Sequence, residues 1–180
     1  IMGVVISVVM GILLTMPTSS AAIWIAIASG STSDAMMLAG GAAVVGCAAQ
    51  MVGFAVMTFK ENGVGGLISQ GIGTSMLQIP NIMKHPLIFV PPIIASAIVG
   101  PIATCVFKLR CTAGGGGMGT SGLVGVFGAV EASKGVVSDA NIALGIVFLM
   151  FVIPAVVSLL FRILFEKKGW IKGEWMKLDV

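Results

Sequence analysis

Charged side chains are scarce in this sequence: they make up 9% of its 180 residues, whereas hydrophobic residues make up 57%. A soluble domain usually carries about 25% charged residues, and the mean hydropathy here is +1.10. Apolar segments with few charges recur along the whole length, which a single signal peptide or anchor does not explain. The composition therefore predicts a membrane protein without a separate soluble domain.

Residues that build metal and redox sites are also few. There is one histidine, His85, and the three cysteines, Cys47, Cys105 and Cys111, form no CxxC pair. We therefore expect no disulfide framework, no metal site, no cofactor and no catalytic residue, with the cysteines serving as small buried or juxtamembrane thiols. No basic stripe is interleaved with aromatic residues, so nucleic acid is not an expected partner.

Six stretches have about the 20 apolar residues that a helix needs to cross the hydrocarbon core. They are 1–28, 36–58, 64–82, 87–107, 114–130 and 142–164. Pro17 breaks the first stretch, which is either one kinked span or a helix, a polar turn and a second half-helix. The sequence thus predicts an all-α polytopic membrane protein with about six transmembrane or re-entrant segments. We expect a transmembrane transporter domain over 1–165 and a short cytoplasmic tail over 166–180.

Lysine and arginine are distributed unevenly among the predicted connections. If the six stretches cross alternately and the tail is cytoplasmic, only Lys84 and Lys134 lie outside. The eight inside are Lys60, Lys108, Arg110, Arg162, Lys167, Lys168, Lys172 and Lys177. Because cytoplasmic loops carry an excess of basic residues, this split favours six passes, although a re-entrant pair could replace one crossing. His85 then falls in an outside loop, where we expect a solvated side chain.

Two of the six stretches are weak as simple spans because they are rich in glycine. One contains GIGTSMLQIPNI at 71–82 and the other contains GMGTS at 117–121. Glycine destabilises a helix by about 1 kcal/mol per residue relative to alanine. Backbone groups freed in lipid must be satisfied by protein or by water in a cavity. We therefore predict two broken helices that face the protein interior.

The repeated pentapeptide, GIGTS at 71–75 and GMGTS at 117–121, gives both segments the same chemistry. Glycines let a backbone turn and approach a ligand, and Thr or Ser caps the half-helix that follows. The amides at such a helix start favour an anionic or polar ligand, and paired broken segments indicate a transporter's central site. In the alternative interpretation, the glycines only allow close helix packing and the hydroxyls bond back to their own helices.

Gln78 and Asn81 flank Pro80, which disfavours helical geometry at Ile79, so we expect the chain to unwind near Pro80. Their amides offer donors and acceptors for sugar hydroxyls or an ordered water; alternatively, they are polar glue between helices. With the two pentapeptides they complete the predicted substrate-binding set: Gly71, Gly73, Thr74, Ser75, Gln78, Asn81, Gly117, Gly119, Thr120 and Ser121.

Long motifs give the chain a specific resemblance. They are MPTSSAAIWIAI, GCAAQMVGFAVMTFKENG, ENGVGGLISQGIGTSMLQIPNIMKHPLIFVPPIIASAIVGPIATCVFKL, GGMGTSGLVG and KKGWIKGEWMKLDV. The chain resembles the membrane (IIC-type) subunits of the bacterial phosphotransferase system, in the group that also contains the perfringolysin regulator proteins. It resembles their C-terminal half, and since it opens on Ile1 we expect an N-terminal half of the same chain to precede it.

The resemblance implies a multi-pass permease in the bacterial inner membrane, with its C-terminus in the cytoplasm. It would carry a sugar inward while separate cytoplasmic subunits transfer the phosphoryl group. The expected partners are the bilayer, a small polar solute, those subunits and the N-terminal half; a homo-oligomer is left open. The alternative function is a membrane-embedded sensor or regulator that binds a ligand without transporting it.

Overall fold

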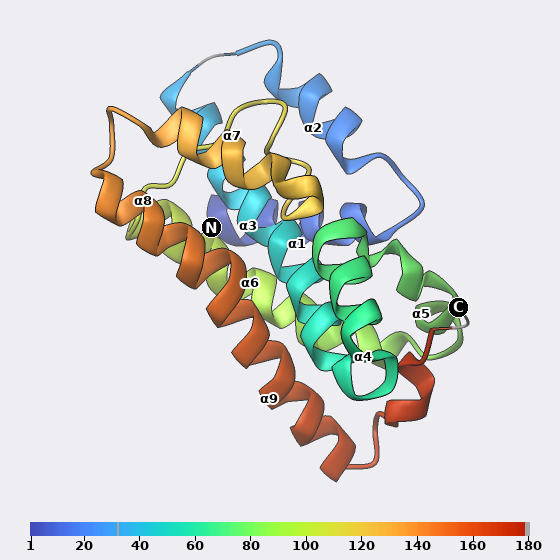
Figure 1. Cartoon of the computed structure of the whole chain (residues 1–180). Helices are drawn as coiled ribbons and strands as arrows, with labels where there is room; N and C mark the ends of the chain where they lie inside the picture. The colour runs from blue at the N-terminus through green and yellow to red at the C-terminus, as the bar shows by residue number, and fades with distance from the viewer. Residues whose placement is uncertain (32, 179–180) are drawn as a thin grey trace.

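The computed structural model describes residues 1–31 and 33–178, most of which are helical (Figure 1). Three helices are long and apolar enough to cross a membrane, which together with shorter apolar helices confirms the predicted all-α membrane fold. The three are α3 (Asp34–Met57), η3 with α6 (Pro86–Phe89 and Val90–Cys105), and α8, η5 and α9 in continuous succession (Asp139–Gly145, Ile146–Val152 and Ile153–Lys167). Positions 179–180 of the predicted tail lie outside the described residues.

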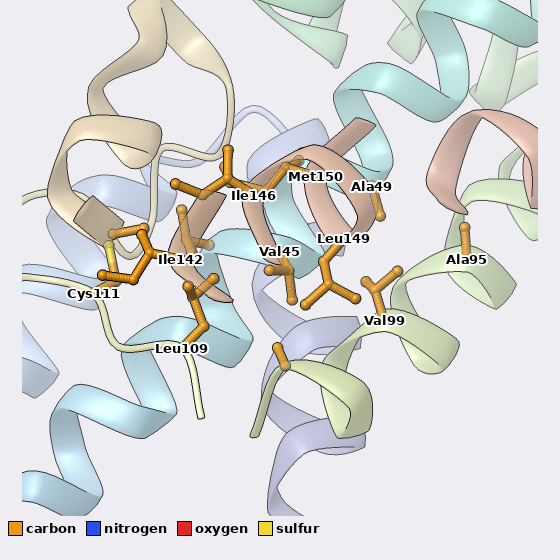
Figure 2. Packing of buried hydrophobic residues seen from close by; sticks show 14 residues of the cluster. Val45, Ala49, Ala95, Val99, Leu109, Cys111, Ile142, Ile146, Leu149 and Met150 are labelled. Atoms are coloured by element: carbon orange, nitrogen blue, oxygen red, sulfur yellow. The ribbon is translucent and has the colours of Figure 1, made fainter. Parts of the chain in front are cut away.

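The three long helices meet in one apolar core, which Figure 2 shows from close by. Helix α3 packs against both α6 and α9, which also contact each other, and α3 is buried over most of its length. The labelled side chains are Val45 and Ala49 from α3, Ala95 and Val99 from α6, Leu109 and Cys111 from the connection after α6, and Ile142, Ile146, Leu149 and Met150 from α8 and η5. This core fixes the frame on which the broken segments are mounted.

The first predicted stretch is two helices, α1 (Met2–Thr15) and α2 (Ser20–Ala28), not one kinked span. Pro17 lies in the turn between them, and the hydroxyl of Ser19 caps α2 by accepting from the Ala22 amide at 3.2 Å. Helix α1 packs against α3 and α6. The break therefore follows the second of the two possibilities that the sequence left open.

Helices α1 and α3 approach so closely that glycine is required between them. A Cβ placed on Gly46 would lie 2.0 Å from the backbone oxygen of Ser7. At the same crossing, the Ser7 hydroxyl donates to the Ser96 carbonyl of α6 at 2.8 Å. Helices in lipid associate through close van der Waals packing and interhelical hydrogen bonds, and small residues permit both.

The glycine-rich stretch at 64–82 is not one continuous helix but turns back on itself. It is part of a first re-entrant loop (residues 59–84), built from α4 (Phe59–Ile68), η1 (Ser69–Gly73), η2 (Ser75–Gln78) and α5 (Ile79–Lys84). Asn62 on its first arm and Asn81 on its last arm both hydrogen-bond the C-terminal segment. Both ends of the loop therefore lie on the side of the molecule where the C-terminal segment lies, as Figure 1 also shows.

The second glycine-rich stretch is likewise an out-and-back excursion, from the opposite side. This second re-entrant loop (residues 106–133) has an irregular first arm, then η4 (Ser121–Leu123) and α7 (Val124–Ser133). Its ends are clamped together, since the Ser133 hydroxyl accepts from the Arg110 amide at 2.9 Å and donates to the Arg110 carbonyl at 3.1 Å. The Arg110 guanidinium also pairs with Asp34, at the start of α3, at 2.6 Å.

The predicted alternation of six passes is therefore wrong at both glycine-rich stretches. His85, expected outside, stacks on Trp175 of the C-terminal segment, with ring centroids 3.9 Å apart. Arg162 contacts Glu61 and the Met57 end of α3, and His85 contacts the C-terminal segment, so seven basic residues are assigned to the side of that segment: Lys60, Lys84, Arg162, Lys167, Lys168, Lys172 and Lys177. Lys108, Arg110 and Lys134 lie on the other side. The prediction failed because average hydropathy adds together the two arms of a loop. It contains no information on whether the chain reverses direction between them.

The chain also unwinds at a different place from the one predicted. The break falls at Thr74, whose φ of −159° and ψ of 141° are extended, just after the π-helical turn η1. Pro80 instead lies in the first turn of α5, and Ile79 is helical. A proline there loses nothing, because the first amides of a helix have no intrahelical partner.

The C-terminal segment after α9 packs against the membrane domain. Beyond Lys167 it contains η6 (Gly173–Met176), and the side chains of Ile171 and Met176 are 2% and 0% exposed. Both belong to an apolar cluster with Phe54 of α3 and Phe89 before α6. The segment is thus part of the folded core on its side of the molecule.

We predict that exposed cysteines will report the re-entrant arrangement. In a Cys105→Ser background, where Cys47 and Cys111 stay buried, Lys84→Cys and Lys172→Cys should react with an impermeant maleimide from the same side of sealed vesicles. Lys134→Cys should react only from the other side. Labelling of Lys84→Cys from the side that labels Lys134→Cys would mean that the first loop crosses.

The α1–α3 crossing gives a second prediction. Gly46→Ala should lower the free energy of unfolding by about 1–3 kcal/mol, because the added methyl forces two helix backbones apart. Gly65→Ala is the matched control, since no atom lies within 4 Å of its added Cβ, and it should be neutral or slightly stabilising. Thermal unfolding of the detergent-solubilised protein measures both; equal melting temperatures for the two variants would contradict the close contact.

Candidate functional site

The two repeated pentapeptides meet at the tips of the two re-entrant loops. The Thr120 hydroxyl donates to the Gly71 carbonyl at 2.6 Å, and the Ser121 hydroxyl donates to the Gly73 carbonyl at 2.9 Å. Thr120 also lies 3.5 Å from the sulfur of Met51, on the inner part of α3. We call these four residues the tip junction: Gly71, Gly73, Thr120 and Ser121.

The helix break in the first loop explains why its carbonyls are available. The π-helical turn η1 ends at Gly73, and the extended Thr74 interrupts the helical hydrogen-bond pattern after it. The carbonyls of Gly71 and Gly73 then take hydroxyl donors from the other loop. The alternative that the second pentapeptide's hydroxyls bond back to their own helix is wrong for both side chains.

The two hydroxyls of the first pentapeptide have different partners. The Thr74 hydroxyl accepts from the Met76 amide at 3.1 Å and so caps η2, as predicted for this position. The Ser75 hydroxyl is 2.9 Å from that of Thr15 at the end of α1, and both are 0% exposed. The first loop is therefore tied to α1 as well as to the second loop.

The glycines of the second pentapeptide serve close packing. Gly119 has a φ of +56°, and an added Cβ would lie 2.7 Å from the Ala48 amide nitrogen of α3. An added Cβ on Gly117 would lie 2.5 Å from the Ser20 carbonyl oxygen of α2. These two positions follow the packing alternative, and they hold the second loop against α2 and α3.

Gln78 and Asn81 lie away from the tip junction, in a network of side-chain amides on the first loop. The Gln78 amide nitrogen donates to the side-chain oxygen of Gln70 at 3.0 Å, and the Asn81 nitrogen donates to that of Gln78 at 2.9 Å. Gln70 in turn donates to the Thr58 hydroxyl at 2.8 Å. Sequence reasoning missed Gln70; the signal was present as a second glutamine in the same apolar stretch.

The same amides bind the backbone of the C-terminal segment. The Met176 carbonyl accepts from Asn62 at 2.9 Å and from Gln78 at 3.1 Å, and the Lys177 carbonyl accepts from Asn81 at 3.0 Å. The Asn62 oxygen accepts from the Leu178 amide at 2.8 Å. The polar-glue alternative therefore describes these amides, with the C-terminal segment as an unforeseen partner.

A buried charge cluster fixes the base of the first re-entrant loop. Arg162, on α9, is 5% exposed and donates to Glu61 at 2.9 Å, to Glu166 at 2.9 Å and to the Met57 carbonyl. Glu61 stands at the start of the loop, so the cluster ties that start to α9. Burying Arg162 requires such pairing, because an unpaired buried charge is strongly destabilising.

Cavities of different character adjoin the first loop. One of about 560 Å³ lies at its base against α9 and is lined by Lys60, Arg162 and Glu166 together with apolar side chains. A polar cavity of about 420 Å³ is lined by Glu61, Asn62 and Ser69 of the loop and by Lys177 and Leu178 of the C-terminal segment, among others. An apolar cavity of about 430 Å³ on the side of Gly71 is lined by aliphatic and aromatic side chains of α3, α4, η5 and α9. The polar cavity and the cavity at the base of the loop offer side-chain hydrogen-bonding groups for a hydroxyl-bearing molecule, whereas the side chains that line the apolar cavity offer none.

A comparison with known protein families identifies the family of this chain. The family model described as "Phosphotransferase system, EIIC" matches residues 1–178, and the chain belongs to this family. It is therefore an integral membrane subunit of a phosphotransferase-system permease, which works with other components of that system. No curated protein and no solved structure matched the chain.

The tip junction yields a stability prediction. Thr120→Val should lower the free energy of unfolding by about 1–3 kcal/mol, because it leaves the Gly71 carbonyl without its donor. Thr120→Ser keeps the hydroxyl and should recover most of that loss. Denaturant or thermal unfolding in detergent measures the difference, and a Thr120→Val protein as stable as Thr120→Ser would show that the hydrogen bond contributes nothing.

Proposed function

We propose that this chain forms the translocation path of the permease and binds a small polar solute, a sugar, where the two re-entrant loops meet. The observation that carries the proposal is the pair of hydroxyl-to-carbonyl hydrogen bonds from Thr120 and Ser121 to Gly71 and Gly73. Transporters commonly place their substrate site between broken segments near the bilayer midplane, lined by free backbone groups. The tip junction supplies such groups.

Hydroxyls and backbone carbonyls are the groups that recognise a neutral polyol. In the proposed cycle, the loop tips separate and a sugar's hydroxyls replace the contacts that Thr120, Ser121 and the glycine carbonyls now make with one another. Each neutral hydrogen bond contributes about 0.5–1.5 kcal/mol net, so an exchange of partners is nearly balanced in free energy. The remaining predicted residues, Gly117 and Gly119 among them, would shape the loops.

We place the C-terminal side in the cytoplasm of a bacterium, with the chain in the inner membrane. Seven of the ten basic residues lie on the C-terminal side and three lie on the other, and cytoplasmic loops carry the excess of Lys and Arg. The cytoplasmic phosphotransferase subunits would then approach the end of the molecule that carries the C-terminal segment. They, and not this chain, would carry the phosphoryl group.

The test is uptake of labelled hexoses and hexitols by the full chain in sealed proteoliposomes, with and without phosphotransferase partner subunits. We expect sugar phosphate to accumulate only with the partners present. Ser121→Ala should lower uptake by about tenfold, which corresponds to the loss of about one hydrogen bond of 1.4 kcal/mol. Ser138→Ala, in an exposed connection, is the matched control and should transport normally.

The sensor function is the contrary outcome of the same experiment. Saturable binding of a sugar without flux under any condition would overturn the transport proposal. Equal uptake by Ser121→Ala and Ser138→Ala would leave transport standing but remove the tip junction from the solute path.

A further inference from the structure

We propose that the segment Ile171–Leu178, here called the strap, closes access to the first re-entrant loop by occupying the loop's amides with its own backbone. The inference rests on the proposed function in one respect, namely that a solute must reach this loop. The strap and the loop are nearly a hundred residues apart in sequence, yet four hydrogen bonds join them.

The loop recognises the strap through backbone groups. Asn62 donates to the Met176 carbonyl and accepts from the Leu178 amide, so its side chain pairs with the strap as a neighbouring strand would. Gln78 donates to the same Met176 carbonyl, and Asn81 donates to the next one, that of Lys177. Side-chain amides that bind peptide carbonyls are equally suited to hydroxyls, because both are neutral hydrogen-bond partners.

The strap bridges the two arms of the loop. Asn62 belongs to the first arm, and Gln78 and Asn81 belong to the last. As long as these three side chains all bind the strap at residues 176–178, the two arms stay at a fixed distance from each other. A loop whose arms are bridged in this way cannot open toward the C-terminal side without releasing the strap.

Three side chains of the strap act as its anchors, and one of them is Ile171, which is 2% exposed in the apolar cluster. Met176 is 0% exposed within the apolar cluster, and Trp175 stacks on His85 with an angle of 7° between the rings. Glu174, in contrast, has an exposed side chain and belongs to neither the apolar cluster nor the lining of the polar cavity. Binding of the strap therefore depends on Ile171, Met176 and Trp175 and is insensitive to the Glu174 side chain.

The strap also covers the polar cavity beside the loop. Lys177 and Leu178 form one wall, and Glu61, Asn62 and Ser69 form the facing wall. Withdrawing the strap would open this cavity to solvent and free the amides of Asn62, Gln78 and Asn81 together. The same movement would thus open a route and expose three groups that bind a polyol.

The first test measures access without any solute. In a Cys105→Ser background, Ser69→Cys in detergent-solubilised full chain is reacted with a charged methanethiosulfonate. We expect Met176→Asp to raise the labelling rate at least tenfold, since a carboxylate cannot remain in the apolar cluster. Trp175→Ala should raise the rate by a smaller factor, and Glu174→Ala, an exposed strap position outside the cavity lining, should leave it unchanged.

Size-exclusion profiles establish that each variant is folded, and Trp175→Ala decides the question if Met176→Asp does not fold. An unchanged labelling rate in the folded anchor variants would overturn the inference. So would an equal rise in Glu174→Ala, which would indicate general loosening.

The second test measures uptake of labelled hexoses and hexitols with the partner subunits. A disulfide between Trp175→Cys and His85→Cys should lower the initial rate, and reduction should restore it. If access rises in the anchor variants while the disulfide leaves uptake unchanged, the strap covers the cavity without controlling transport and the inference fails. If the wild-type chain moves no sugar, the proposed function fails, and the access test alone decides whether the strap closes the loop.

Discussion

Backbone hydrogen bonding inside a membrane is the constraint on which the rest of this structure depends. A helix broken in lipid leaves N–H and C=O groups that cost several kcal/mol each when unsatisfied. The first re-entrant loop has spare carbonyls at Gly71 and Gly73, and the second supplies donors from Thr120 and Ser121. Because the second loop supplies the donors that the break in the first loop needs, the two tips come together.

Helix α3 sets the distance at which this exchange is possible. An added Cβ would meet the backbone of the second loop at Gly41, that of α1 at Gly46, and the Ser158 hydroxyl of α9 at Gly53. In lipid there is no hydrophobic drive to press these elements together, so close contact of small residues takes its place. Larger side chains along α3 would push the second loop outward, and the hydroxyls at its tip would no longer reach the first loop.

Composition and local pattern were sufficient to predict the helical membrane fold, and the repeated pentapeptide correctly drew attention to two broken segments. The direction of those segments was not predictable from hydropathy, because a loop that turns back and a helix that crosses the membrane have the same average hydropathy. Pro80 was misjudged because a proline in a first helical turn costs nothing, and the break falls instead at the extended Thr74.

The hydrogen-bond partners of Gln78 and Asn81 could not be predicted from the sequence, for a different reason. Their hydrogen bonds run to the backbone of Met176 and Lys177. Backbone carbonyls are present at every residue, so no pattern marks the ones that an amide will bind. The same holds for Gly71 and Gly73, whose role at the tip junction depends on their carbonyls and not on their lack of side chains.

The order of elements along the chain shows how one path could be closed from either side. Helix α3, the first re-entrant loop and α6 form one unit, and α6, the second re-entrant loop and the α8–α9 helix form another, with α6 shared. The two loops start from opposite sides, so each can withdraw toward its own side while the other stays in place.

The bases of the loops resist this movement more than their tips do. Arg162 holds the first loop through two carboxylates, and hydrogen bonds between the Arg110 backbone and the Ser133 hydroxyl hold the second. Breaking a buried ion pair costs about 3–5 kcal/mol, whereas the tip hydrogen bonds contribute about 0.5–1.5 kcal/mol each. Movement in the proposed transport cycle is therefore concentrated at the tip junction, where the solute would have to pass.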